Sequence, residues 1–189
     1  MEKDDADLIR EFAEGNAEAM ETLFERYKKP VLNFALRILN NRADAEDVAS
    51  EVFLVLVTRR YSPQPGAKFS TWLFTVARNA CLTRVRKKGK LLSLWFTKDS
   101  GEEELWDVPD AAALPREDLA RQETVQQIRQ AISTLPDEQK EALVLREYHN
   151  LSYDDISKVL GCSLEKVKIL IYRARERLRA DLPAMMREG

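Results

Sequence analysis

The chain has 189 residues, of which 44% are hydrophobic and 33% charged, with few glycines or prolines to serve β-turns. This composition is typical of a soluble, helix-rich globular protein, and we expect an all-α fold. The formal net charge of −2 argues against a protein coated in positive charge. Two cysteines and one histidine supply neither a zinc cluster nor a disulfide framework, so we expect no metal and no other cofactor.

No apolar run approaches the roughly 20 residues needed to span a membrane. The N-terminal sequence MEKDDADLIR is acidic, unlike a signal peptide. We therefore expect no membrane insertion and a cytoplasmic location.

Charges are unevenly distributed along the chain. Basic residues gather at 84–98 and 166–179, whereas residues 99–118 and the N-terminal third are acidic. Such segregation suits a protein that touches DNA with two patches and another protein with the rest of its surface.

Apolar residues recur at helical spacing from residue 6 to 39, with Gly15 ending a first helix and Pro30 predicting a bend or a new turn in the second. A third helix is predicted from DAEDVASEVFLVLVTRR, with Asp44 as its cap and Asp47 reaching back. Glu46, Ser50 and Glu51 are left on its solvent side, where they are candidates for a protein contact.

The two prolines and the glycine within residues 61–68 predict a loop, and a helix is expected to begin at Ser70 or Thr71. Phe69 and Trp72 precede a group of amide and basic side chains on this helix: Arg78, Asn79, Arg84, Arg86, Lys87 and Lys88. Rings that stack on bases, together with cations that hold the backbone, indicate single-stranded nucleic acid binding. The alternative is that Trp72 is simply a core residue.

Residues 91–121 break the composition with Gly101, Pro109, Pro115 and many acids, which is typical of a linker between domains. Two helical patterns follow, separated at Pro136. With the motif described next, they predict a C-terminal domain of four helices.

Residues 151–179, LSYDDISKVLGCSLEKVKILIYRARERLR, predict two helices joined by a tight turn. Ser152 and Ser163 can cap the two helices, and Gly161 can end the first in a left-handed conformation. Val167, Ile171, Ala174 and Leu178 make one apolar stripe on a second helix that is otherwise strongly basic. This pattern indicates a helix-turn-helix that binds DNA.

Together these features resemble a bacterial RNA polymerase sigma factor of the two-domain, extracytoplasmic-function type. The segment DAEDVASEVF resembles the polymerase-binding segment of that family, and FSTWLFTVARNACLTRVRKK resembles its helix that melts and reads the minus-10 element. The segment from Leu135 to Arg179 resembles its minus-35 domain. The resemblance implies two small helical domains, 1–90 and 121–189, joined by a flexible acidic linker at 91–120.

The resemblance also implies roles for particular residues. Those expected to bind the core polymerase are Asp47, Ser50, Glu51 and Phe53. Those expected at the minus-10 element, where a flipped base is captured, are Tyr61, Lys68, Phe69, Trp72, Asn79, Arg84, Arg86 and Lys87. Those expected at the minus-35 element are Ser163, Glu165, Lys166, Lys168, Ile169, Tyr172, Arg173 and Arg175.

The implied function is to bind core RNA polymerase and direct it to specific promoters, under the control of an anti-sigma factor. One alternative is a stand-alone helix-turn-helix regulator, which needs a dimerisation helix or a sensor pocket. Another is an enzyme acting on nucleic acid, but the chain has no P-loop glycines, no metal-ligand cluster and no nucleophile–base pair. We therefore expect no catalytic residue.

Overall fold

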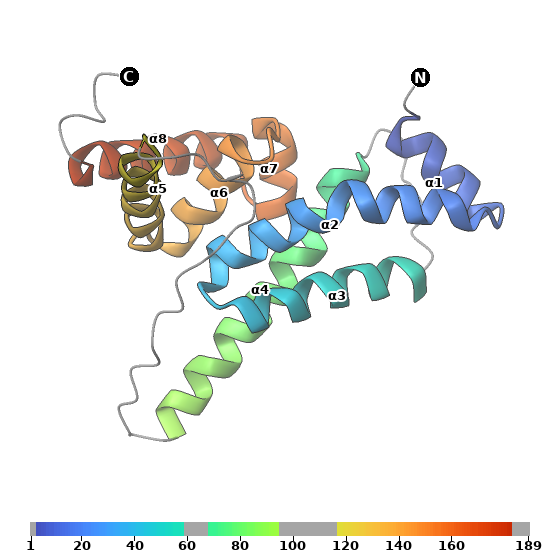
Figure 1. Cartoon of the computed structure of the whole chain (residues 1–189), viewed down its shortest axis with the longest axis horizontal. Coiled ribbons are helices and arrows are strands. Elements are labelled where there is room, and N and C mark those ends of the chain that lie inside the picture. Colours follow the sequence, from blue (N-terminus) through green and yellow to red (C-terminus); the bar gives the residue numbers. More distant parts are fainter. Residues whose placement is uncertain (1–2, 59–67, 95–116, 183–189) are drawn as a thin grey trace.

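The computed structural model describes residues 3–58, 68–94 and 117–182. Within these ranges the chain forms eight α-helices and no β-strand, so the all-α expectation is confirmed (Figure 1). The helices are α1 (Asp5–Ala13), α2 (Ala17–Leu39), α3 (Arg42–Thr58), α4 (Phe69–Leu94), α5 (Glu117–Ser133), α6 (Asp137–Glu147), α7 (Tyr153–Leu160) and α8 (Leu164–Asp181).

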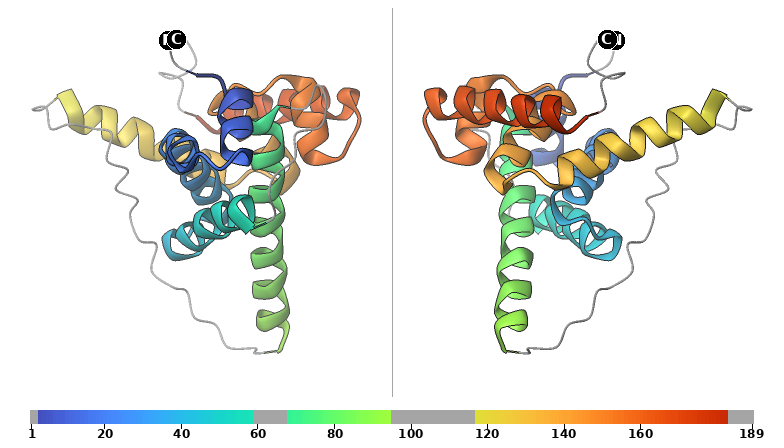
Figure 2. Two further views of the ribbon diagram at one scale, coloured as in Figure 1. Left: turned by 90° about the vertical axis from the view of Figure 1, so that its right-hand side faces the viewer. Right: turned by 90° about the vertical axis from the view of Figure 1, so that its left-hand side faces the viewer.

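Helices α1 to α4 form an N-terminal body in which α2 packs against α1, α3 and α4. Its centre is made of fully buried apolar side chains, and the rings of Phe34 and Phe74 meet edge to face with centroids 5.5 Å apart. Pro30 lies inside α2 and does not begin a new element. The C-terminal half of α4 projects beyond the other helices (Figure 2).

The start of α3 differs from the sequence-based expectation. Asp44 was expected to cap this helix, but the helix already begins at Arg42. The side chain of Asn41 accepts a hydrogen bond of 2.9 Å from the backbone N–H of Asp44. Asn41 therefore takes the capping role, and Asp44 lies in the first turn, where its charge suits the helix dipole.

The helix-turn-helix forms as its sequence predicts. Ser152 Oγ accepts from the backbone N–H of Asp155 at 3.1 Å, and Ser163 Oγ accepts from that of Lys166 at 3.2 Å. Gly161 ends α7 with φ of 65°, in the left-handed region that glycine adopts at little cost. Val167, Ile171 and Ala174 are buried beneath α8, and so is Leu170.

The C-terminal body, α5 to α8, packs directly on the N-terminal body. Helix α7 lies against α4, while α5 and α6 lie against α2 (Figure 1). Most of the expected linker, residues 95–116, lies outside the described residues. Its first four residues belong to α4 and its last four to α5.

Candidate nucleic-acid and protein interfaces

One face of α3 is open to solvent and carries three of the four residues expected to bind a protein partner. Asp47, Ser50 and Glu51 are exposed. Phe53 is not: it is 7% exposed, and its ring meets that of Phe24 edge to face at 4.7 Å. The side chain of Phe53 therefore supports the helix from within the core, and a polymerase contact by this residue stays a prediction.

The same face of α3 carries two apolar residues that the sequence reasoning missed. Leu54 is 62% exposed and Val57 is 49% exposed. They follow Asp47 by seven and ten residues, a spacing that keeps all three on one side of a helix. Extending that helical spacing beyond Glu51 would have found them. Exposed apolar side chains next to carboxylates are typical of a protein-binding surface.

The aromatic pair at the start of α4 is packed rather than open. Phe69 is 5% exposed and stacks on the half-buried Trp72 with ring centroids 5.9 Å apart. Its ring also meets that of Tyr27 edge to face at 5.3 Å. This packing favours a core role for Phe69, which has little surface left for a base. Tyr61, with the rest of residues 61–67, lies outside the described residues.

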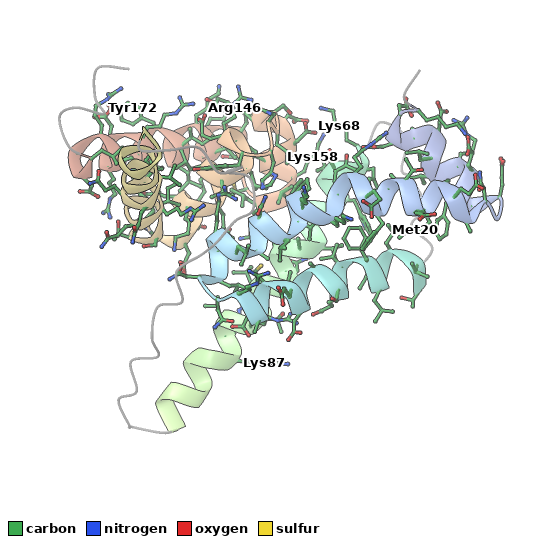
Figure 3. The ribbon with its side chains drawn as sticks, in the orientation of Figure 1. Met20, Lys68, Lys87, Arg146, Lys158 and Tyr172 are labelled. Carbon is green, nitrogen blue, oxygen red and sulfur yellow. The ribbon has the colours of Figure 1, made fainter. Side chains whose placement is uncertain are left out.

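The remaining expected minus-10 residues lie along the length of α4. Asn79, Arg86 and Lys87 are exposed, and Lys87 stands on the projecting half of the helix (Figure 3). Arg84 is less free, because its Nη1 donates to Glu51 Oε2 of α3 at 2.8 Å. This ion pair joins the predicted DNA-binding helix to the predicted polymerase-binding helix.

Two further cations, Lys68 just before α4 and Arg78 within it, are paired with the C-terminal body. Lys68 Nζ lies 2.7 Å from Asp155 Oδ2, and Arg78 Nε lies 2.7 Å from Glu141 Oε2. Thr71 Oγ1 donates to the second oxygen of Asp155 at 3.1 Å. The carboxylates of α6 and α7 thus contact one face of the helix that the sequence assigns to the minus-10 strand.

Burial and hydrogen bonding shift the pKa values of Asp155 and Glu141 in opposite directions. Burial opposes the ionisation of Asp155, but hydrogen bonds from Lys68, Ser152 and Thr71 outweigh it and hold its pKa below the ordinary value. Glu141 is more deeply buried, and its pKa is raised even though the Arg78 guanidinium partly offsets the effect. Arg78 is therefore the counter-ion on which the charge of Glu141 depends.

Helix α8 presents an exposed face above its buried stripe. Lys168, Ile169, Tyr172 and Arg173 are exposed, with Tyr172 the most prominent at 65% (Figure 3). Cations, a phenol and an apolar side chain together can contact phosphates, base edges and thymine methyl groups in a major groove. This is the arrangement expected of a recognition helix.

The other expected minus-35 residues lie at the edges of that face. Ser163 caps α8, and Glu165 is exposed in its first turn. Lys166 pairs with Glu138 at 2.6 Å, and Arg175 pairs with Glu147 at 2.6 Å. Exposed pairs such as these are worth at most about 1 kcal/mol, so a phosphate can readily replace the carboxylate.

Neither cysteine forms a disulfide. Cys81 is fully buried, and burial raises the pKa of its thiol to about 12, which suits a core residue. Among the described residues no group of histidine, cysteine or acidic side chains has the arrangement of a metal site. None of the described helices is long and apolar enough to cross a membrane.

These features define a helix-turn-helix DNA-binding protein with a second basic helix in a separate helical body. Comparison with known families narrows the class. The family model described as Sigma-70 region 2 matches residues 23–91, and that described as Sigma-70, region 4 matches residues 125–178. The chain belongs to the sigma-70 family of RNA polymerase sigma factors, in its extracytoplasmic-function group.

Individual relatives agree over almost the whole length. The ECF RNA polymerase sigma factor SigW of Bacillus subtilis is 32% identical, covering 92% of this chain and 94% of its own. The RNA polymerase sigma-H factor of Pseudomonas aeruginosa is 28% identical, covering 100% and 98%.

Solved structures show the same fold at lower identity. The sigma factor RpoE from Bartonella quintana, in complex with the anti-sigma factor NepR, superposes with a TM-score of 0.70 at 23% identity, covering 85% of this chain and 94% of that one. CnrH, in complex with the cytosolic domain of CnrY, superposes with a TM-score of 0.65, also at 23% identity, covering 93% and 95%.

A sigma factor binds core RNA polymerase and directs it to promoters, and this is the function of the chain. The match at both ends of the chain favours this function over the stand-alone regulator.

Proposed function

We propose that the three exposed surfaces divide the work of promoter recognition. The α3 face binds the core polymerase, α4 contacts the melted minus-10 strand and the adjoining duplex, and α8 reads the minus-35 element. The observation that carries this assignment is that each surface lies on a different helix and differs in chemistry: acidic and apolar on α3, basic on α4, and basic with Ile169 and Tyr172 on α8. We place the domain boundaries near residues 90 and 121.

On α3 we propose that Asp47, Ser50 and Glu51 supply the polar contacts and that Leu54 and Val57 supply the apolar area. A protein interface gains most of its affinity from a few well-packed, desolvated side chains. Leu54 is the most exposed aliphatic side chain of this face and is the best candidate for such an anchor.

On α4 we propose that Asn79, Arg86 and Lys87 contact DNA directly, with Lys68 and Arg84 joining them once their carboxylate partners release them. Trp72 remains a candidate for stacking on a base, because it is only half-buried. The flipped base itself is assigned to the neighbourhood of residues 61–69. The minus-35 contacts are assigned to Lys168, Ile169, Tyr172 and Arg173, with Ser163, Glu165, Lys166 and Arg175 around them.

We propose further that the protein acts in the cytoplasm, where core polymerase and chromosome meet, and that it has no enzymatic activity of its own. Control by an anti-sigma factor is also proposed. It is supported by the sigma factor RpoE from Bartonella quintana, which has the same fold and whose solved structure is a complex with the anti-sigma factor NepR.

The test is to mix the purified chain with core RNA polymerase and fragmented genomic DNA and to map the 5′ ends of the transcripts. We expect a defined set of start sites that share two spaced upstream elements. Leu54→Arg is expected to abolish these transcripts together with comigration with polymerase, whereas Arg10→Ala, on an exposed position of α1, leaves both intact. Absence of transcripts and of comigration for the unmodified chain would contradict the assignment.

A further inference from the structure

We propose that Glu165 and Ile169 set the base preference of α8: Glu165 reads a cytosine and Ile169 a thymine, within about two base pairs of each other. The inference rests on the proposed assignment of α8 to the minus-35 element, and it deepens that assignment by naming the bases that this chain selects. Glu165 then reads a base itself instead of lying at the edge of the recognition surface.

Four residues of α8 form a line along the side opposite its buried stripe. The stripe consists of Val167, Leu170, Ile171 and Ala174. At 3.6 residues per turn, the positions that point away from it are Glu165 and those that follow it by four, seven and eleven residues. All four are exposed, and we call them the outer line of α8: Glu165, Ile169, Tyr172 and Glu176.

Exposed basic side chains flank the outer line on both sides. Roughly a quarter turn away on one side lie Lys168, Arg175 and Arg179, and on the other lie Lys166, Arg173 and Arg177. A helix in the major groove has a phosphate backbone on each flank and base edges in front of its outermost side chains. The flanking cations are therefore near phosphates, whereas the outer line faces the floor of the groove.

Glu165 brings a negative charge into a surface that otherwise suits DNA. None of the residues that the structure describes forms an ion pair with its carboxylate, whereas Glu176 pairs with Arg179 at 2.7 Å. Phosphates repel an unpaired carboxylate, so it is tolerated in a groove only where a base offers it a donor. Cytosine offers its N4 amino group there, whereas the major-groove edge of guanine and the O4 atom of thymine are acceptors. Adenine offers an amino group beside the N7 acceptor, which suits an amide side chain instead.

The position of Glu165 in the first turn of α8 has a second physical consequence. The helix dipole favours a carboxylate at that end of a helix, whatever the helix binds. Such a role adds to the stability of the chain and is indifferent to the base sequence. The reading role depends instead on the place of Glu165 in line with Ile169 and Tyr172, so the two roles differ in what a substitution at Glu165 changes.

Ile169 lies one turn beyond Glu165 on the outer line and is 49% exposed. Its side chain has no hydrogen-bonding group, and the apolar group that a base presents in the major groove is the C5 methyl of thymine. Four residues of helix advance about 6 Å, against about 3.4 Å for each base pair, so the thymine lies within about two base pairs of the cytosine. Tyr172 comes next on the line, and because its hydroxyl both donates and accepts, we assign it no single base.

The test uses the polymerase complex of the full chain and a promoter from the mapped start sites, with its minus-35 element randomised. Sequencing the bound and unbound fractions gives the base preference at each position. For the unmodified chain we expect enriched sequences that share a cytosine with a thymine within about two base pairs. In Glu165→Gln the ratio of cytosine to adenine at the first position should fall at least about fivefold, because the glutamine amide pairs with N6 and N7 of adenine.

Glu176→Gln is the matched control. It makes the same chemical change on the outer line, but it lies about 16 Å further along α8, whereas the N-terminal residues of a recognition helix contact the base edges. We expect its base preference to match that of the unmodified chain. A folded Glu165→Gln variant that is less stable but keeps the preference for cytosine would show a dipole role alone and would overturn the proposal.

Ile169 is tested on the enriched promoter by replacing the thymine with uracil, which removes only the methyl group. We expect the unmodified complex to bind the uracil promoter about fourfold more weakly, and the Ile169→Ser complex to bind both promoters equally. Equal binding of both promoters by the unmodified complex overturns the role of Ile169. An intact polymerase complex that selects no minus-35 sequence contradicts the assignment of α8 and, with it, the proposal. That outcome is distinct from a selection that Glu165→Gln leaves unchanged.

Discussion

At the scale of single residues, His149 is the clearest case of a side chain whose environment was set by packing. Burial against the two bodies, with the charge of Arg37 nearby, lowers the pKa of His149 to about 4. Among the described residues its Nε2 atom is buried without a hydrogen-bond partner. The imidazole is therefore neutral in the folded protein at neutral pH, and its ring packs against those of Phe74 and Phe34.

We predict that acidification weakens this interface. An exposed histidine titrates near 6.5, so between pH 6.5 and about 4 the unfolded chain binds a proton that the folded chain does not. Stability supplied by neutral His149 is fully present above pH 6.5 and is lost as the pH falls to 4, by at most about 3 kcal/mol. Urea unfolding at a series of pH values measures this loss.

His149→Phe isolates the histidine contribution. Phenylalanine keeps a ring between Phe34 and Phe74 but cannot be protonated. Glu141 acts in the opposite direction, since its raised pKa makes protonation favour the folded chain. The effect of Glu141 is the same in the unmodified chain and in His149→Phe. It therefore cancels in the difference between their unfolding free energies at each pH. Parallel stability curves for both proteins between pH 6.5 and 4 would show that His149 does not titrate there.

A second prediction at this scale concerns Lys168 on the exposed face of α8. If it reads a base edge, Lys168→Ala should weaken promoter binding by about 1–3 kcal/mol. The measurement is the affinity of the polymerase complex for a matched promoter. Lys158→Ala, an exposed lysine of α7, is the control and should change little. Unchanged affinity for Lys168→Ala would remove this residue from the contacts.

At the scale of elements, local sequence signals were sufficient where a helix end depends on its own residues. The caps at Ser152 and Ser163 and the left-handed end at Gly161 were all predicted and are all confirmed. The start of α3 offers two side chains that can cap a helix, Asn41 and Asp44, three positions apart. The sequence pattern favoured Asp44, whereas Asn41 is the cap in the structure. Which of them caps depends on how the chain leaves α2, where Asn40 is left-handed with φ of 47°.

The turn between α7 and α8 gives a prediction at this scale. Gly161→Ala should cost about 1–2 kcal/mol of unfolding free energy, because an L-residue is disfavoured at a φ of 65°. An added Cβ would meet no atom within 4 Å, so the cost is one of backbone conformation and not of crowding. Thermal or urea unfolding measures it. Gly161→Asn is the control, since asparagine tolerates this conformation, and an equal loss for both variants would point to another cause.

At the scale of the whole molecule, the two DNA-binding surfaces belong to bodies that contact each other directly. The sequence-based expectation was of two domains separated by a flexible linker. A free factor of that kind binds promoter DNA weakly, because the spacing of its two DNA-binding surfaces is undefined. The packing of the two bodies adds a second reason for weak binding, since Lys68 and Arg78 are already paired with carboxylates.

We predict that core polymerase raises the affinity for a matched promoter by at least about 100-fold. Polymerase would hold the two bodies apart, so that binding of one surface raises the effective concentration of the other. Fluorescence anisotropy of a labelled promoter, titrated with the free chain and with the polymerase complex, gives the ratio. A scrambled sequence of the same length controls for binding to phosphates alone, and equal affinities with and without polymerase would contradict the prediction.

The sequence by itself determined the all-α class, the helix-turn-helix with its caps, and the helices that carry the candidate sites, because periodicity and capping depend on residues within a few positions of one another. It did not reveal that Phe69 is buried or that Leu54 is exposed, since these facts depend on which neighbouring helix covers each face. Least of all did it reveal the ion pairs between the two helical bodies. Lys68 and Asp155 are 87 residues apart, and Arg78 and Glu141 are 63 apart. No local pattern specifies such partners, and only the packing of one helical body on the other brings them within hydrogen-bonding distance.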